Sequence, residues 1–385
     1  ASSCMLSRMR SAMVSRSKIR ASVQTRLWGV SAGRCELCNR PLYSDLTFGV
    51  DGNYAEVAHI YAVSSGGPRH QNTMTDEEIN NISNLMLLCE EHHHMIDSQP
   101  ENFAGSVLID RKREHERRIR EATEISDKQS CRIVTFFSNI DLNANFSSEQ
   151  LLKQAVRSLQ MFPKQHPVID LSKDSRTRYE PTKENMIQRS EDLETQVRIW
   201  LEQIIRSEDA IAVFALAPQP LLIKFGTLIN DQQNTYVFQC HRTGHKWAWG
   251  LESVPVVFQS IQSYQNSREK IALVIDLSAE IQDQRIIDVL DKNCSIYHLS
   301  ITAPNRDFVT SIGIQDAFVR ELRNILERIK NDNPTAECIH IFPAMPNSLA
   351  VRMGMDFMPK ADLPWVIYEQ AGANTGFIET ITIGG

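Results

Sequence analysis

Several features are missing from this chain of 385 residues, and each absence excludes a class of protein. No run of about 18 consecutive apolar residues exists, so no membrane-spanning helix is expected. The first residues carry charges without an apolar core behind them, so we expect no secretory signal. Neither Gly-x-Gly-x-x-Gly nor Gly-Lys-Ser/Thr occurs, which excludes the usual dinucleotide and P-loop fingerprints. We also find no Ser-His-Asp or Cys-His signature of a small-molecule α/β enzyme.

Cysteine is sparse, and its spacing does not suggest disulfides. Of the eight cysteines, Cys35, Cys38 and Cys89 have the spacing of metal ligands. The other five are scattered: Cys4, Cys131, Cys240, Cys294 and Cys338. We expect these five to be small core residues of a protein in a reducing cytoplasm.

Acidic residues are missing from the first 34 positions, although the whole chain has a net charge of −6. This segment instead contains seven cations: Arg8, Arg10, Arg16, Lys18, Arg20, Arg26 and Arg34. A second basic run, 111–120, includes Glu114 and Glu116, whose charges can pair along a helix. Both runs could contact phosphates. For the second run, a solvated helix face is an equally good interpretation.

Between the two basic runs lie four soft metal ligands: Cys35, Cys38, Cys89 and His92. Three thiolates and one imidazole match a closed tetrahedral zinc site in number and softness. The two-residue gap after Cys89 selects His92 among the three consecutive histidines. His59, Asn84 and His93 remain as harder donors, suited to a harder cation and a base. This combination predicts a metal-dependent nuclease.

Residues 35–97 resemble an HNH endonuclease, which has the ββα-metal fold. The resemblance is carried by CELC at 35–38, AEVAHI at 55–60, SSGGPRH at 64–70 and NISNLMLLCEEHHHMID at 81–97. It implies that His59 is the general base, that Asn84 orients the segment bearing it, and that His93 binds the catalytic metal. That metal would be Mg²⁺ or a similar divalent ion, and the zinc would be structural.

Two positions depart from the family pattern. His92 stands where the second cysteine pair usually ends in Cys, which preserves a zinc ligand. Ala58 stands where many members carry an Asp ligand just before the first His. Glu56 shares a strand face with position 58, because side chains alternate along a strand, and is the candidate replacement.

The apolar periodicity and turn residues of the N-terminal part predict a series of short elements. We expect helices over 15–31, 84–97 and 108–124, a strand over 54–63, and a loop over 64–80. The predicted domains are an HNH domain with a basic N-terminal helix (1–125), a linker (126–149) and a second domain (150–385). The linker includes an expected apolar strand over 132–137, flanked by polar segments.

In the second domain, apolar strands alternate with helices, which predicts α/β units with a largely parallel sheet. The expected strands are 210–216, 235–240, 271–277, 295–301, 338–342 and 365–368. The expected helices are 191–206, 219–229, 281–291, 308–330 and 346–357. In such sheets, ligands bind beyond the carboxyl ends of strands, where helix N-termini present free N–H groups.

The C-terminal region resembles the SAVED domain, which consists of two fused CARF-like (Rossmann-like) units. The resemblance lies in 271–281, 308–330 and 338–369. It implies a sensor for a cyclic di- or trinucleotide. An HNH domain followed by SAVED resembles the effectors of bacterial antiphage (CBASS) signalling. That implies a bacterial cytoplasmic protein that degrades double-stranded DNA, and a homo-oligomer, a dimer or an activated tetramer, without a membrane partner.

Candidate ligand-binding residues stand at turns and helix starts: Gln219, Lys224, Ser278, Asn305, Arg306, Met345, Asn347 and Ser348. Trp247 and Trp249 could stack on a base, or could equally be core residues. Two other functions stay open from the sequence. One is an ungated HNH restriction endonuclease that reads modified DNA, and the other is a zinc-stabilised nucleic-acid-binding module without catalysis.

Overall fold

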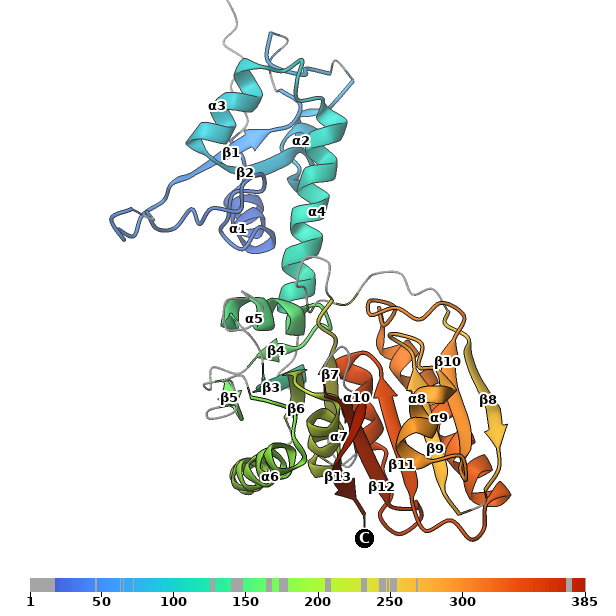
Figure 1. Cartoon of the computed structure of the whole chain (residues 1–385). Helices are drawn as coiled ribbons and strands as arrows, with labels where there is room; N and C mark the ends of the chain where they lie inside the picture. Colours follow the sequence, from blue (N-terminus) through green and yellow to red (C-terminus); the bar gives the residue numbers. More distant parts are fainter. Residues whose placement is uncertain are drawn as a thin grey trace, which may run out of the picture. The chain divides into compact units, whose positions relative to one another are not determined.

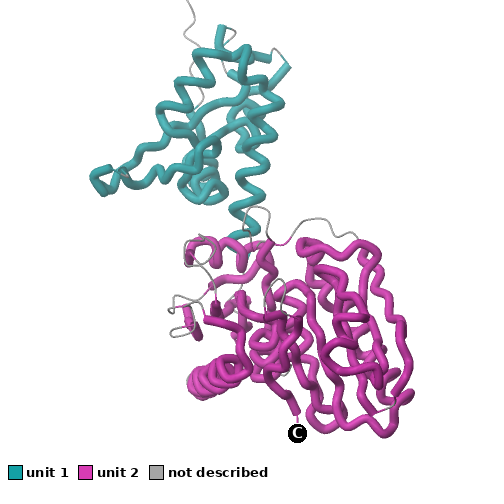
Figure 2. The backbone as a smooth tube through the Cα atoms, viewed as in Figure 1, with its two compact units in different colours: residues 1–125 teal, residues 126–385 magenta. Residues whose placement is uncertain are grey.

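The structure is a computed structural model with two compact units, which are described separately. Unit 1 spans Ala1–Ile125 and unit 2 spans Ser126–Gly385 (Figure 2). The described residues are 18–45, 47–62, 64, 66–71, 73–124, 129–139, 148–163, 168–172, 179–204, 209–229, 234–241, 247, 249, 255–267, 269–371 and 376–384. Within these ranges, no helix has both the length and the hydropathy that crossing a membrane requires.

Unit 1 is built on a two-stranded antiparallel sheet (Figure 1). Its elements are α1 (Ala21–Val30), β1 (Ala55–His59), α2 (Asp76–Ile79), the 3-10 turn η1 (Ile82–Asn84), β2 (Leu85–Cys89), α3 (Glu90–Ser98) and α4 (Gly105–Thr123). In the sheet, Ala55 pairs with Cys89 and His59 pairs with Leu85. The register therefore places the ends of β1 beside the start of α3 and beside η1.

Two predicted helices of unit 1 begin later than expected. Residues 85–89 form β2 rather than the first turns of a helix over 84–97, and α3 begins only at Glu90. All five residues of β2 are buried, and a short continuous apolar run cannot be assigned to strand or helix by periodicity. Similarly, α1 begins at Ala21, because Arg20 is extended. The positions 15–17 lie outside the described residues.

The predicted loop 64–80 contains the short helix α2. Thr75 caps this helix, since its side chain accepts a hydrogen bond from the Glu78 N–H while the Glu78 carboxylate accepts one from the Thr75 N–H. This is a capping box, and the sequence Thr75-x-x-Glu78 signals it. The helix fixes the polar residues that follow it near the end of β1.

The first sheet of unit 2 has the order β4-β3-β6-β7, with β5 also paired to β3, and all its pairings are parallel. Its elements are β3 (Ser130–Phe137), α5 (Glu149–Arg157), β4 (Phe162–Pro163), β5 (Ile169–Asp170), α6 (Lys183–Ile204), β6 (Ala210–Leu216), α7 (Gln219–Leu228) and β7 (Thr235–Phe238). The strand β3 lies between β4 and β6. Residues 130–137 of the predicted linker 126–149 therefore belong to this sheet.

The second sheet of unit 2 has the order β13-β12-β11-β9-β10-β8. Its elements are β8 (Phe258–Gln265), β9 (Ile271–Asp276), α8 (Asp283–Leu290), β10 (Ser295–Ile301), α9 (Ile312–Asp332), β11 (Ile339–Ala344), α10 (Asn347–Met355), β12 (Trp365–Gln370) and β13 (Phe377–Ile383). The four central strands are parallel, whereas the edge strands β8 and β13 are antiparallel to their neighbours. Neither edge strand was among the expected strands.

The two sheets of unit 2 are joined through α7 and α10, which pack directly against each other (Figure 1). Pro218 and Pro346 are the N-caps of these helices, and Gly226 and Gly354 follow at the same sequence distance. A Cβ on Gly354 would lie 1.9 Å from the backbone oxygen of Ile223, so only glycine permits this approach. The N-terminus of each helix follows the carboxyl end of a strand.

Candidate nuclease and sensor sites

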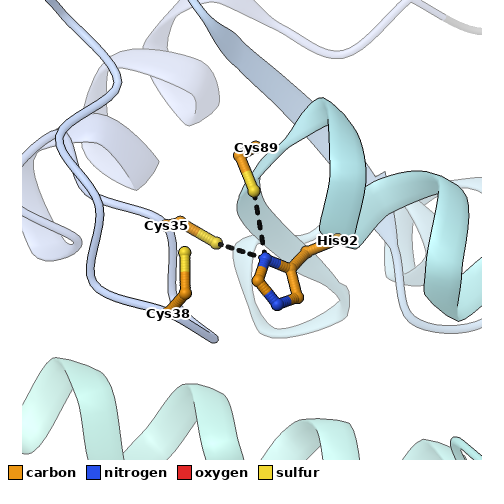
Figure 3. A group of neighbouring side chains, drawn as sticks. All are labelled: Cys35, Cys38, Cys89 and His92. Carbon is orange, nitrogen blue, oxygen red and sulfur yellow. Dashed lines mark hydrogen bonds between the residues drawn. The ribbon is translucent and has the colours of Figure 1, made fainter. Parts of the chain in front are cut away.

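The four predicted zinc ligands of unit 1 come together. The ligand atoms of Cys35, Cys38, Cys89 and His92 lie within 4.8 Å of one another, and the side chains converge in Figure 3. The Nδ1 atom of His92 lies 3.0 Å from the Cys89 sulfur and 3.8 Å from the Cys35 sulfur. These separations suit four donors around one ion with metal–sulfur bonds of about 2.3 Å.

The chemistry of this cluster also favours a cation. Burial, followed by the neighbouring thiols of Cys35 and Cys89, raises the pKa of the Cys38 thiol to about 11. A bound cation would favour the thiolate form of Cys38 against this shift. The cluster fits a structural zinc site, with Cys35 and Cys38 on a turn and Cys89 and His92 at the start of α3.

A buried ion pair connects the cysteine turn to α4. Glu36 and Lys112 are both almost fully buried, and the Lys112 amine lies 3.5 Å from the Glu36 carboxylate. Burial raises the pKa of Glu36 to about 7, although Lys112 opposes this shift. Further along α4, Arg118 donates to Asn39 at 2.9 Å. Part of the second basic run therefore has a structural function.

The predicted base His59 stands at the end of β1. Its Nε2 atom lies 3.2 Å from the side-chain oxygen of Asn80. The Asn80 amide nitrogen donates to the backbone oxygen of Asp76, which orients its oxygen toward the imidazole. An amide oxygen only accepts, so this contact assigns the proton to Nε2 and leaves the Nδ1 lone pair of His59 available.

Asn84 is buried and holds the chain immediately after His59. Its side-chain oxygen accepts from the Tyr61 N–H at 2.9 Å, and its amide nitrogen donates to the backbone oxygens of Tyr61 and Ile79. The backbone oxygen of Asn84 also accepts from the Ile60 N–H at 2.8 Å. Asn84 therefore ties both the end of β1 and the end of α2 to η1, as an orienting residue would.

His93 lies on α3 between two carboxylates. Its Nδ1 atom is 4.0 Å from the Glu56 carboxylate, and its Nε2 atom is 3.4 Å from the Asp97 carboxylate. Asp97 in turn pairs with Arg69 at 3.2 Å, and Arg69 donates to the backbone oxygen of Ile60. A metal-binding histidine commonly presents one ring nitrogen to the ion and the other to a carboxylate. His93 and Glu56 are therefore placed to hold a divalent ion together.

Ala58 cannot take part in such a site. It is fully buried in the apolar core of unit 1, opposite Met86. Glu56 lies at the exposed part of the same strand, two residues earlier. Strand alternation thus gives the two positions a common face, but only Glu56 reaches His93.

In unit 2, several predicted ligand-binding residues meet where α7 and α10 begin. The Gln219 amide nitrogen donates to the Met345 backbone oxygen at 2.9 Å and lies 3.5 Å from the Asn347 side chain. Ser278 is close to this point, because its N–H donates to the Ala344 backbone oxygen at 2.7 Å. The carboxyl ends of β9 and β11 thus meet the starts of α7 and α10. We call this region the polar edge, and it contains Gln219, Ser278, Met345, Asn347 and Ser348.

This polar edge contains buried atoms that lack partners among the described residues. They are the Ser348 hydroxyl and the side-chain oxygen of Gln219. Each helix start is also bound by a side chain from the other sheet. Glu369 on β12 accepts a hydrogen bond from the Gln219 N–H at the start of α7, and Gln239, which follows β7, accepts one from the Ser348 N–H at the start of α10. Burial raises the pKa of Glu369 to about 7. Buried polar groups without partners need an explanation, and a ligand at this edge could supply the missing hydrogen bonds.

Comparison with known families identifies both units. The family described as HNH endonuclease matches residues 35–99, and the family described as SMODS-associated and fused to various effectors sensor domain (SAVED) matches residues 193–383. The chain joins an HNH domain to a SAVED domain. No curated protein matches it.

Solved structures similar to the chain include SAVED/CARF-domain containing Cap4 receptors. The Acinetobacter baumannii receptor with the cyclic trinucleotide 3'3'3'-cAAA is 13% identical, with a TM-score of 0.41, and the match covers 81% of this chain and 67% of that chain. The same receptor with 2'3'3'-cAAA is 15% identical, with the same coverages and a TM-score of 0.40. The Moraxella osloensis receptor is 11% identical, with a TM-score of 0.39 and coverages of 76% and 60%.

Three predicted ligand residues of the SAVED domain have other partners. Trp247 is 2% exposed and packs edge-on against Phe214, so the prediction that it stacks on a ligand is corrected: it belongs to the core. Trp249 stacks on Phe238 and is only partly buried. The Lys224 amine pairs with Glu194 at 2.8 Å.

Asn305 and Arg306 lie on an exposed turn of the SAVED domain. The Asn305 N–H donates to the backbone oxygen of Leu277, so this turn is close to Ser278. The turn therefore adjoins the polar edge without being buried in it.

Sequence reasoning missed Asn80, Arg69 and Asp97 in the HNH domain. The contact of Asp97 with His93 could have been predicted, because Asp97 lies four residues after His93 on the same helix face. Arg69 lies inside the quoted loop 64–70, but only the fold brings it to Ile60 and Asp97. In the first basic run, Arg8, Arg10 and Arg16 lie outside the described residues.

Proposed function

We propose that the protein is a metal-dependent endonuclease for double-stranded DNA, activated by a cyclic di- or trinucleotide, and that it acts as an effector of bacterial antiphage defence. The observation that supports this most directly is the arrangement around β1. His59, Asn84 and His93 are each held by polar partners beside a Cys₃His cluster, in a chain that also contains a SAVED domain.

His59 is the general base in this proposal. Its Nδ1 lone pair takes a proton from water, the water oxygen bonds to phosphorus, and the bond from phosphorus to the leaving oxygen breaks. The leaving oxygen then takes a proton from solvent. Asn80 holds the other ring nitrogen, and Asn84 fixes the backbone that follows, so the imidazole keeps one tautomer and one orientation.

His93 and Glu56 would hold the catalytic ion, with Mg²⁺ or Mn²⁺ as the candidates. When bound, a divalent ion neutralises charge on the phosphate and stabilises the leaving oxygen. Asp97 fixes the ring of His93 through Nε2, and Arg69 holds Asp97 in place. The zinc cluster binds no substrate but rigidifies the turn and helix that carry these groups.

The polar edge of the SAVED domain is the proposed activator site. Ligand there would satisfy the buried Ser348 hydroxyl and Gln219 oxygen, and activation requires that it bind the active state more tightly than the resting state. We propose that the active state is a homo-oligomer in which two HNH domains cut both strands. Size measurements with and without ligand test this step.

The test uses the full chain, plasmid DNA and Mg²⁺, with a panel of cyclic di- and trinucleotides. We expect cleavage with at least one ligand, and a drop of about 10²- to 10⁴-fold in the cleavage rate of His59→Ala. The Kd of that variant for the activating nucleotide should stay unchanged. Cleavage at the wild-type rate in His59→Ala would exclude His59 as the base, and equal cleavage without any nucleotide would favour an ungated restriction enzyme.

Adjacent histidines on α3 provide a matched pair of variants. His93→Ala should abolish metal-dependent cleavage, because it removes the proposed ligand beside Glu56. His94 is exposed on the same helix, and His94→Ala should cleave like the wild type. Equal loss in both variants would show that α3 is merely sensitive to substitution. Chelation by EDTA, followed by re-addition of Mg²⁺, should abolish and then restore cleavage.

A further inference from the structure

A cavity of about 590 Å³ lies in the HNH domain between the start of α1 and the region of α2. Three of the residues that line it are cations: Lys18, Arg20 and Arg26. All three are exposed, and none forms an ion pair with a residue in the described part of the chain. Three unpaired cations around one hollow favour an anionic occupant.

One side chain that lines the cavity also contacts the proposed catalytic base His59. Asn80 lines the cavity, and the side-chain oxygen of Asn80 lies 3.2 Å from Nε2 of His59. The Asn80 side chain therefore lies between a molecule in the cavity and the proposed base, on the Nε2 side of the His59 imidazole.

The opposite wall of the cavity has a different character. It includes Asp76 and Glu77 in the first turn of α2, which the capping box of Thr75 holds in place. Carboxylates repel phosphate but accept hydrogen bonds from base amino groups. A nucleotide matches the two sides of the cavity, because it has an anionic phosphate at one end and a hydrogen-bonding base at the other.

We propose that this cavity holds one nucleotide of the substrate strand beside the scissile phosphodiester, with its phosphate on Lys18, Arg20 and Arg26. This inference rests on the proposed nuclease function and adds a strand-binding site to it. Asn80 would then have two neighbours, the bound nucleotide and His59. Filling the cavity would fix the register of the strand relative to the base.

The test compares two triple variants with equal loss of charge. One replaces Lys18, Arg20 and Arg26 by Ala. The other replaces three exposed arginines of α4 that do not line the cavity: Arg111, Arg113 and Arg120. Cleavage of DNA is followed at several salt concentrations with the activating nucleotide present. Cleavage of bis(p-nitrophenyl) phosphate, which has no neighbouring nucleotide, is measured in parallel.

We expect the cavity variant to raise the KM for DNA roughly 10- to 100-fold, with kcat nearly unchanged. The dependence of log KM on log salt should become shallower by about 1, because the three cations hold a single phosphate. Hydrolysis of the small diester should stay at the wild-type rate, which also shows that the domain is folded. The α4 variant should change the KM for DNA much less.

A gain of affinity provides a second test that misfolding cannot imitate. Asp76→Asn with Glu77→Gln keeps the hydrogen-bonding shape but removes the repulsion, so the KM for DNA should fall. An unchanged KM and salt dependence in the cavity variant, or equal effects of both triple variants, would overturn the inference. If the wild type cleaves neither DNA nor the small diester, the proposed function itself fails.

Discussion

The HNH domain and the SAVED domain arrange their polar groups in opposite ways. In the HNH domain, each predicted catalytic side chain already has a protein partner. His59 is bound by Asn80, Asn84 binds the backbone around it, and His93 lies beside Asp97. These groups are oriented before any substrate arrives, which is what a catalytic site requires.

The SAVED domain instead leaves polar atoms unsatisfied at its helix starts. The Ser348 hydroxyl and the Gln219 side-chain oxygen are buried without a partner among the residues that the structure describes. A buried group in this state costs about 1–3 kcal/mol, which a bound ligand can recover. The comparison fits the proposed roles, with oriented catalytic groups in one unit and a ligand site in the other.

The two units also differ in what holds them together. The apolar core of the HNH domain includes Cys35 and Cys89, so its zinc cluster is continuous with its core. Its sheet has only two strands, which are marginally stable without further support. The SAVED domain has two larger sheets with extensive apolar clusters and contains none of the zinc ligands. Loss of zinc should therefore destabilise the HNH domain and leave the stability of the SAVED domain unchanged.

Loss of zinc is expected to have the largest effect. Cys89→Ser, or removal of zinc with a strong chelator, should unfold the HNH domain, because structural zinc contributes on the order of 10 kcal/mol to small domains. The SAVED domain should keep its own unfolding transition and its ligand affinity. Calorimetry combined with metal analysis measures both. Cys338→Ala is the control, since this half-buried cysteine lies in the SAVED domain and should not change zinc content.

A substitution at Gly354 should destabilise the SAVED domain and spare the HNH domain, with a smaller loss of stability than zinc removal causes. In Gly354→Ala the added methyl would lie 1.9 Å from the Ile223 backbone oxygen, so α7 and α10 must separate. We expect a loss of about 3 kcal/mol from the SAVED transition and weaker nucleotide binding, with zinc content unchanged. In Gly313→Ala, on α9, the nearest atom would be 3.7 Å away, and stability should change little. Similar losses in both variants would contradict the close-packing explanation.

Sequence reasoning succeeded where the signal is local. The strands β6 and β10 have the expected bounds, since each is a short apolar run between turn residues. The zinc ligands were also readable, because their types and spacing carry the chemistry. In the SAVED domain, helix starts correctly marked the positions of Gln219 and Asn347 at one edge, since parallel strands end together.

The sequence failed where distant contacts decide. The sequence predicted an apolar strand over 132–137 but placed it in a linker because polar segments flank it, and only the pairing of β3 with β6 shows that it is central. Asn80 contacts His59 because α2 and η1 bend the chain back toward β1, which no spacing rule predicts. The sequence left Trp247 open between a stacking platform and a core residue, because the aromatic cluster around Phe214 that buries it forms only in the folded sheet.

The smallest effect concerns two glutamates whose partners differ. Burial raises the pKa of both Glu369 and Glu36 to about 7, but Glu369 lies beside the Gln219 N–H, whereas Glu36 in the HNH domain faces the Lys112 amine. Between pH 4.5 and 7 the folded protein keeps a proton on Glu369 that the unfolded chain releases, so this group makes stability fall as pH rises.

Glu369→Gln removes that ionisation cost. At pH 8 it should stabilise the SAVED transition by about 1–2 kcal/mol, less than the about 3 kcal/mol of the full pKa change because the amide accepts weaker hydrogen bonds. The gain should vanish below pH 4.5. Because burial also raises the pKa of Glu36 to about 7, Glu36→Gln should change the stability of the HNH domain with the same sign at pH 8. The gain should be smaller than in Glu369→Gln, because the substitution also weakens the pairing of the buried Lys112, which among the described residues then keeps only Glu116. Calorimetry across this pH range measures both gains, and an equal gain in both variants would mean that Lys112 does not compensate Glu36.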